Sequence, residues 1–196
     1  RLQGDWSSDV CSSDLHTFPF HRLQQISETL AASAKVLHRS IRIRDNAEVS
    51  VVDWEVITSS WIDDPIERRR ETAFAVRPAA AGAQKVFVWC AKPYPASSGE
   101  RSLKKLLDNA EALNAMVESR GGVARSQLRA LATAYGQQTD GMQVTFNQLP
   151  TSLREALNQY GIKGPWEERG RSEAVAILPD LVEVMEISRL KGNVGA

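Results

Sequence analysis

Two carboxylates placed two residues apart are the closest that this chain comes to a catalytic pair. Asp53 and Glu55 lie within Val49–Thr58, a stretch rich in the β-branched residues that strands favour. On a strand, residues i and i+2 point to the same face, so both carboxylates would project together. Such a pair could hold a divalent cation or divide acid and base work. The stretch lacks the Glu-x-Lys form of metal-dependent nucleases, which favours a solvated sheet face instead.

Arginine clusters offer a second chemistry, the recognition of phosphate. Arginine outnumbers lysine in residues 16–91, and its planar guanidinium suits bidentate phosphate contacts. Tryptophans in loop-like contexts could stack on nucleic-acid bases. Acidic residues at 63, 64, 67 and 71 flank the central arginine run, which favours local neutralisation over a nucleic-acid face. The residues predicted to contact nucleic acid are Arg68, Arg69, Arg70, Arg125, Arg129, Trp61 and Trp166.

Histidine and cysteine are too scarce for most nucleophilic or metal chemistry. Cys90 lies among apolar neighbours that would bury its thiol, so we interpret it as a small core residue. The chain has no HExxH, CxxC, EF-hand loop or phosphate-binding glycine motif, and we expect no metal and no cofactor. The GxxG at residues 161–164 is more simply the end of a helix than an RNA clamp. The three histidines all precede residue 39: His16, His21 and His38.

The first fifteen residues show no helical or strand periodicity. Residues 5–15, DWSSDVCSSDL, resemble the translation of a short-read sequencing adapter. We therefore expect residues 1–15 to be foreign to the native protein and to contribute nothing to its fold. Removing their one arginine and three aspartates from the 24 basic and 24 acidic residues leaves 23 and 21, a net charge of about +2.

Composition indicates a globular protein outside the membrane. The chain has 196 residues, of which 42% are hydrophobic and 24% charged, ordinary values for a globular domain. No stretch approaches the roughly 20 apolar residues that span a bilayer. With Cys11 inside the foreign segment, Cys90 is the single native thiol, which fits a reducing compartment. We expect a cytoplasmic location and no membrane partner.

The N-terminal half is predicted to place a helix before a sheet. Apolar residues recur at three- and four-residue steps from Leu23 to Leu37, the pattern of one helix face. Arg39, Arg42 and Arg44 follow, near the start of the first expected strand. The strands expected from β-branched and alternating residues are Val49–Thr58, Thr72–Arg77 and Lys85–Ala91, arranged antiparallel.

The C-terminal half is predicted to be mainly helical. A capping box at Ser97 and Glu100 precedes an amphipathic helix over Ser98–Arg120, and a second helix follows over Ala124–Tyr135. Alternating apolar residues at 142, 144 and 146 indicate a short strand. A third helix opens with a capping box at 152 and 155 and ends at Gly161, and a fourth would carry Pro165 in its first turn. Residues 174–178 and 181–190 fit either two helices or a hairpin, with a helix favoured for the last segment.

These patterns together predict an α+β fold. It comprises an N-terminal helix, a small antiparallel sheet of three or four strands and a mainly helical C-terminal half. Residues 16–95 would hold the helix and strands, and residues 96–196 the helical part packed on the same domain. The predicted function is a non-catalytic binding or assembly domain, with nucleic acid as the preferred partner and another protein as a further option. The alternative is a carboxylate-dependent hydrolase or nuclease that uses Asp53 and Glu55.

Overall fold

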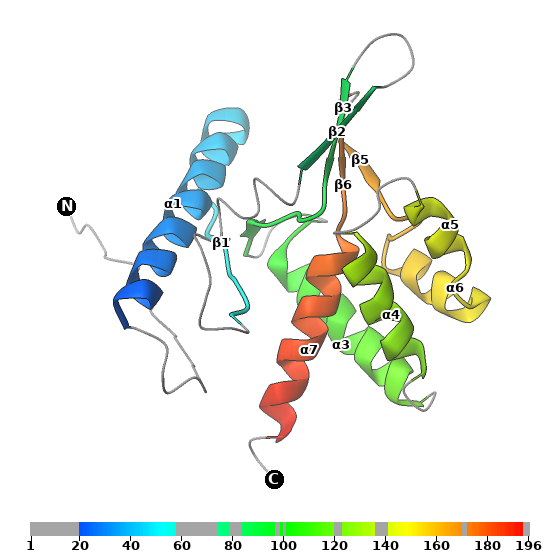
Figure 1. The fold of residues 1–196 in the computed structure, drawn as a ribbon. Helices are drawn as coiled ribbons and strands as arrows, with labels where there is room; N and C mark the ends of the chain where they lie inside the picture. The colour runs from blue at the N-terminus through cyan, green and yellow to red at the C-terminus, as the bar shows by residue number, and fades with distance from the viewer. Residues whose placement is uncertain are drawn as a thin grey trace, which may run out of the picture.

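A computed structural model describes residues 20–57, 74–78, 84–96, 99, 101–119, 123–135, 141–169 and 172–193. Across these residues the chain has the predicted α+β fold: a long first helix, small sheets and a mostly helical C-terminal half (Figure 1). The fifteen residues interpreted as foreign lie outside the described residues. So do Trp61, the run Arg68–Arg70 and the capping box at 97 and 100.

The first helix, α1 (Phe20–Asp45), follows its predicted apolar stripe. Ile26 and Ile41 are its buried residues. The helix continues through Arg39, Arg42 and Arg44, which corrects the expectation that these arginines sit at the start of a strand. The short apolar–basic alternation there fits a helix equally well, because Ile41 extends the buried stripe while its basic neighbours stay exposed.

The first strand is much shorter than its sequence predicts. β1 (Val51–Val52) pairs antiparallel with β4 (Tyr94–Pro95), and the Ala96 N–H donates to the Ser50 carbonyl at 2.7 Å. Residues 53–57 are not in a strand, so the expectation of a strand over Val49–Thr58 is wrong. Pro93 directly precedes the partner strand and Pro95 lies in it, and neither can donate to a ladder, which limits the pairing.

The main sheet joins strands from both halves of the chain. β2 (Phe74–Pro78) and β3 (Gln84–Val88) pair antiparallel, as predicted. β6 (Glu173–Val175) lies parallel to β3, so the four-stranded sheet is mixed rather than antiparallel. β5 (Glu167–Arg169) pairs antiparallel with β6, where the sequence indicated helix after Pro165. In spatial order the strands are β2, β3, β6 and β5.

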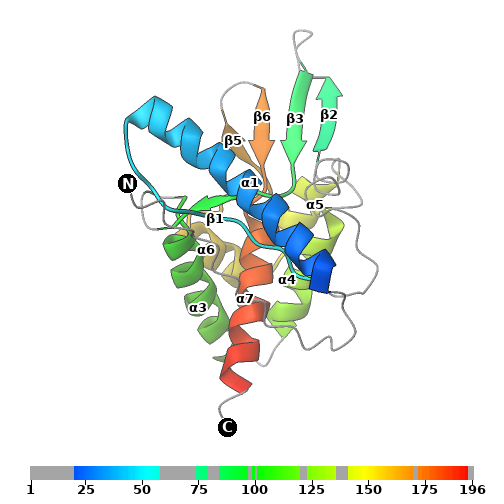
Figure 2. The same ribbon diagram turned by 90° about the vertical axis from the view of Figure 1, so that its left-hand side faces the viewer.

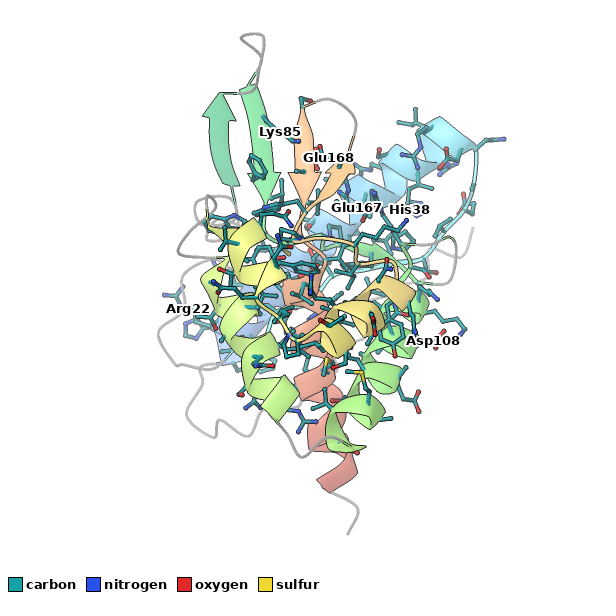
Figure 3. The ribbon with its side chains drawn as sticks, turned by 90° about the vertical axis from the view of Figure 1, so that its right-hand side faces the viewer. Arg22, His38, Lys85, Asp108, Glu167 and Glu168 are labelled. Atoms are coloured by element: carbon teal, nitrogen blue, oxygen red, sulfur yellow. The ribbon has the colours of Figure 1, made fainter. Side chains whose placement is uncertain are left out.

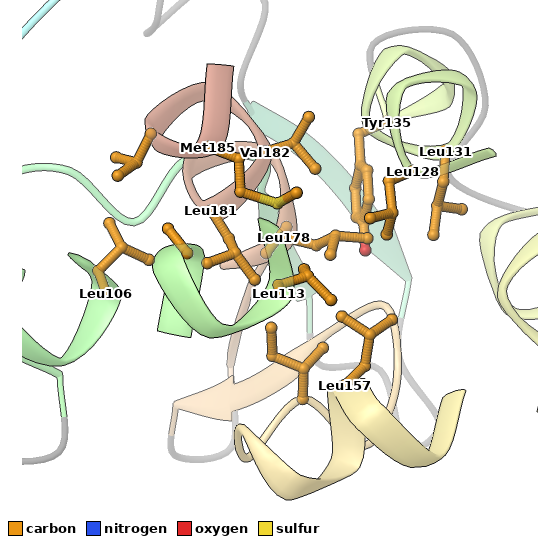
Figure 4. Close-up of a cluster of buried hydrophobic side chains, with 14 of the residues drawn as sticks. Leu106, Leu113, Leu128, Leu131, Tyr135, Leu157, Leu178, Leu181, Val182 and Met185 are labelled. Carbon is orange, nitrogen blue, oxygen red and sulfur yellow. The ribbon is translucent and has the colours of Figure 1, made fainter. Parts of the chain in front are cut away.

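Helices from the C-terminal half enclose the main core. α7 (Leu178–Asn193) packs against both α3 (Leu103–Ser119) and α4 (Val123–Ala134), below the sheet in the view of Figure 1. Pro179 stands in the first turn of α7, where a proline does not interrupt a helix. Figure 4 shows the side chains that meet between these helices and α6 (Thr151–Gln159). Among those that are at most 1% exposed are Leu113, Leu128, Leu131, Tyr135, Leu157, Leu178, Leu181 and Met185.

Two short helices complete the body, the name used here for the described residues from Phe74 onward. The expected strand at 142–146 is instead the helix α5 (Met142–Asn147). Met142 and Phe146 are four residues apart, so one helix face buries both while Val144 stays 59% exposed. The next helix, α6 (Thr151–Gln159), follows Pro150 without a side-chain cap, so the predicted capping box at 152 and 155 does not form. It ends, as predicted, at Gly161, whose φ is +83°.

Candidate functional site

One exposed face of α1 carries three basic side chains. Lys35, Arg39 and Arg42 are spaced four and three residues apart, which places them on the same side of a helix. All three are exposed, and they lie opposite the stripe that contains Ile26 and Ile41. At 1.5 Å per residue the three positions extend over roughly 10 Å of the helix axis. This arrangement is a short positive stripe that faces solvent.

The surroundings of this stripe neutralise it only weakly. α1 contains five basic and two acidic residues, so the helix has a formal charge of +3. Arg44 is paired with Asp45 at 2.7 Å, and the hydrogen bond from Arg44 lowers the pKa of Asp45. Arg42 lies 3.6 Å from Glu48, where both side chains are more than 60% exposed. An exposed pair of this kind contributes about 0–1 kcal/mol and leaves the arginine available to another anion.

The helix is joined to the following segment through His38. Its ring nitrogen Nδ1 lies 2.8 Å from the Val49 carbonyl oxygen, which can only accept, so Nδ1 carries the proton and donates (Figure 3). The chain thus turns back beneath α1 after Asp45, and β1 lies beside the helix in Figures 1 and 2. His38 follows Lys35 by three residues and precedes Arg42 by four, so this contact lies beside the basic stripe, whose three side chains stay exposed.

The two arginines predicted on α4 have partners within the fold. Arg129 makes a two-point contact with Glu186 of α7, with Nε donating to Oε1 at 2.9 Å. The hydrogen bond that Arg129 donates to Glu186 raises the pKa of Arg129. The side chain of Arg125 is only 13% exposed and donates to Asn114 at 3.2 Å, between Glu118 and Glu186. Both arginines therefore connect α4 to its neighbours.

Trp166 also makes internal contacts. Its ring meets Phe87 edge to face at a centroid distance of 4.9 Å, and Tyr135 in the same way at 5.2 Å. The Tyr135 hydroxyl donates to the Pro165 carbonyl at 2.7 Å, and burial raises the pKa of this tyrosine. Trp166 is therefore part of the packing between the sheet and the end of α4. Its ring is engaged by Phe87 and Tyr135 rather than open for a nucleic-acid base to stack on it.

The carboxylates of the alternative hydrolase are not arranged as expected. Asp53 and Glu55 follow the end of β1 at Val52, so the strand geometry that would align them is absent. One oxygen of Asp53 accepts from the Trp54 N–H at 2.9 Å. Within the part of the chain that the structure describes, no three His, Cys, Asp or Glu side chains gather as ligands for a metal ion.

A buried carboxylate at the start of α7 was not singled out by the sequence. Asp180 is 2% exposed, and its Oδ2 accepts from the Ala91 N–H at 2.7 Å and from the Tyr94 hydroxyl at 2.8 Å. Burial raises the pKa of Asp180 to about 6, against the opposing effects of Lys92 and of both hydrogen bonds. The same burial, together with Asp180, raises the pKa of Tyr94. Asp180 therefore holds the chain between β3 and β4 against α7.

Lys92 is buried beside this carboxylate. Its ammonium group pairs with Glu183, and its side chain is only 5% exposed. Desolvation by burial lowers the pKa of Lys92, but attraction to Glu183 and Asp180 outweighs it and the pKa is raised overall. The ammonium also lies 4.7 Å from the ring centroid of Trp54, within the range of a cation–π interaction. A charged Lys92 thus bridges α7 and the segment after β1.

The comparisons with known proteins do not assign a family. No protein-family model matches the chain, and no curated protein matches it significantly. Of the helices in the described ranges, none combines the length and apolar character needed to cross a bilayer. The arrangement of charged and buried residues is therefore the basis for a functional proposal.

Proposed function

We propose that this chain is a non-catalytic binding domain that contacts a nucleic-acid backbone through α1. The observation that carries the proposal is the exposed stripe of Lys35, Arg39 and Arg42, set opposite the buried face of the helix. Lysine and arginine on a continuous face attract phosphates, and each phosphate that they neutralise releases condensed counterions. Because side chains at this spacing lie on one face, all three can meet the same backbone.

Charge pairing elsewhere supports this choice of surface. Most basic side chains in the described part of the body have a carboxylate partner, as with Lys85 and Glu168 on the sheet in Figure 3. The other pairs in the body are Lys92–Glu183, Arg101–Glu167, Lys104–Asp108, Arg125–Glu118, Arg125–Glu186, Arg129–Glu186 and Arg169–Glu173. Among the described residues, Lys35 and Arg39 have no such carboxylate partner, and the partner of Arg42 is an exposed glutamate.

The proposal is tested by measuring the binding of a fluorescent DNA duplex by anisotropy at low salt. Changing Lys35, Arg39 and Arg42 together to alanine is expected to weaken binding of the duplex by at least about tenfold, because three phosphate contacts are lost. A control chain in which Lys104, Lys105 and Lys163 are changed to alanine loses the same formal charge from other surfaces. Its affinity is expected to stay within about threefold of the wild-type value.

Two other results would count against the proposal. If both triple variants lose affinity equally, binding depends on net charge and not on α1. If the wild-type protein binds anionic lipid vesicles but no duplex, the basic helix serves a membrane surface instead. Either result would remove α1 as a nucleic-acid interface.

The arginine run Arg68–Arg70 and Trp61 remain a separate prediction from the sequence. They lie outside the described residues, so nothing in the fold relates them to α1. Changing the three arginines to alanine in the same anisotropy assay tests them directly. A loss of affinity that adds to the loss from the α1 variant would extend the interface to this run.

A further inference from the structure

Residues 20–57 form an arm that makes limited contact with the rest of the described chain. The arm comprises α1, β1 and the segment through Ile57, and the body comprises the described residues from Phe74 onward. The buried residues of α1, Ile26 and Ile41, are not members of the main hydrophobic core. Within the described residues, only Trp54 of the arm packs against that core. The arm is thus a peripheral element anchored by one large side chain.

The body provides a site for Trp54 with both aromatic and charged contacts. The Trp54 ring lies 5.6 Å from the Tyr94 ring, centroid to centroid, with an angle of 32° between their planes. The Lys92 ammonium lies 4.7 Å from the Trp54 ring. Tyr94 is 3% exposed and donates its hydroxyl to Asp180, and Lys92 pairs with Glu183. Both residues that contact the Trp54 ring are therefore held by α7.

The backbone next to Trp54 adds strand pairing to this contact. Val51 and Val52 pair with Pro95 and Tyr94, and the Ala96 N–H donates to the Ser50 carbonyl. In β-strand addition a peptide pairs its main chain with a strand while its side chains enter pockets; here β4 is that strand, and the site beside Tyr94 and Lys92 receives Trp54. Residues 50–54 thus bind to β4 and to the Trp54 site in the way that a separate peptide ligand would, but from within the same chain.

We propose that this site also accepts residues 50–54 from a second copy of the chain. Every copy carries the same complementary segment, so a partner's arm would reproduce the pairing with β4 and the Trp54 contacts with Lys92 and Tyr94. Exchange of an identical element between protomers is a general route to dimers. The intramolecular segment competes at an effective concentration on the order of 1 mM, so exchange is suppressed in dilute solution.

The test uses the full-length Trp54→Ala chain, whose site is unoccupied by an indole ring, and a fluorescent peptide of residues 47–57. The peptide is expected to bind this variant saturably and to bind the wild-type chain at least about tenfold more weakly, because the intramolecular segment competes. A peptide carrying alanine at position 54 is expected to bind about 30-fold more weakly than the parent, a loss typical of a tryptophan anchor. Equal binding of the two peptides would overturn the proposal.

The second copy is tested by sedimentation of the full-length protein. Wild-type dimers are expected as the concentration approaches about 1 mM, and the Trp54→Ala chain is expected to stay monomeric. If the wild-type protein remains monomeric, or if both chains dimerise equally, the exchange is refuted. A Trp54→Leu chain keeps apolar bulk and replaces the alanine variant in both measurements if that variant does not fold.

Discussion

At the scale of single residues, Asp180 links the chain between β3 and β4 to α7. It ties the backbone at Ala91 and the hydroxyl of Tyr94 to the first turn of α7, and both donors are buried with it. A buried carboxylate is costly when ionised, which is why burial raises its pKa despite the nearby ammonium of Lys92. Position and partners, rather than residue type, therefore give this aspartate its role.

The raised pKa of Asp180 makes the stability of the protein depend on pH. Its value of about 6 in the folded chain exceeds the ordinary value of 3.8, so the folded state binds the proton more tightly. Its contribution is fully present below about pH 4 and is lost as the pH rises through 6. Asp180→Asn keeps an acceptor oxygen but does not titrate. Between pH 4 and 7.5, its stability relative to wild type should improve by on the order of 3 kcal/mol.

Urea unfolding of both chains across this pH range measures that change. Asp180→Ala serves as the contrasting variant, because it leaves the Ala91 N–H and the Tyr94 hydroxyl without their acceptor. We expect it to lose about 1–3 kcal/mol or more at every pH. A constant difference in unfolding free energy between wild type and Asp180→Asn from pH 4 to 7.5 would show that Asp180 has an ordinary pKa.

Residue type alone could not distinguish the arginines that have carboxylate partners among the described residues from those that have none there. Arg125 and Arg39 are equally basic in the sequence, yet Arg125 lies between two glutamates while Arg39 faces solvent. Glu186, the partner of Arg129, follows it by 57 positions in the chain. Trp166, which directly precedes β5, similarly meets Phe87 of β3. These contacts depend on the tertiary packing, so the sequence predicts candidate chemistry without indicating which side chains are engaged.

At the scale of elements, α3 shows which apolar positions of an amphipathic helix carry stability. Leu106 is 3% exposed, whereas its neighbour Leu107 is 45% exposed. Leu106→Ala is expected to cost about 2–5 kcal/mol in unfolding free energy, because it leaves a cavity in the core. Leu107→Ala, the identical change at the adjacent residue, should cost under about 1 kcal/mol. Thermal and urea unfolding compare the two, and equal losses would mean that α3 is rotated from the orientation described.

The end of α6 is a second element whose contribution can be measured. Gly161 has a φ of +83°, the Gly161 N–H donates to the Asn158 carbonyl at 3.0 Å, and the Ile162 N–H donates to the Leu157 carbonyl at 2.9 Å. This is the glycine-dependent Schellman ending of a helix. Gly161→Ala should cost roughly 1–2 kcal/mol from the left-handed backbone alone, since no atom lies within 4 Å of an added Cβ.

Asparagine provides the comparison at this position, because it tolerates left-handed backbone better than alanine does. Gly161→Asn should therefore lose less unfolding free energy than Gly161→Ala in the same urea titration. If alanine is tolerated without loss, the backbone at residue 161 does not adopt a positive φ in solution. The prediction that a helix ends at Gly161 came directly from the sequence, since glycine favours this conformation.

Other elements were not predictable from local patterns. Met142, Val144 and Phe146 alternate as in a strand, but burial of the outer two is equally consistent with one helical turn. The segment after Pro165 was expected to be helical, yet it forms β5 and β6, and β6 pairs in parallel with the edge of β3. A contact between residues about 87 positions apart decides that choice, and no local window contains it. Long amphipathic helices such as α1, α3 and α4 were predicted because their stripes extend over several turns.

At the scale of the whole molecule, zero net charge conceals an uneven distribution. The 24 basic and 24 acidic side chains balance overall, but α1 carries a formal charge of +3 while many basic residues of the body have carboxylate partners. The arm also contacts the core chiefly through Trp54. Binding of a polyanion is therefore expected to involve the arm while the body remains folded and unchanged.

The salt dependence of duplex binding tests this account most directly. Log affinity falls linearly with log salt concentration, with a slope of about −0.9 for each phosphate neutralised. We predict that changing Lys35, Arg39 and Arg42 to alanine makes this slope shallower by about 2.7, while the Lys104, Lys105 and Lys163 control leaves it unchanged. If the wild-type protein and the α1 variant show the same slope, these side chains do not contact phosphate and α1 is not the interface.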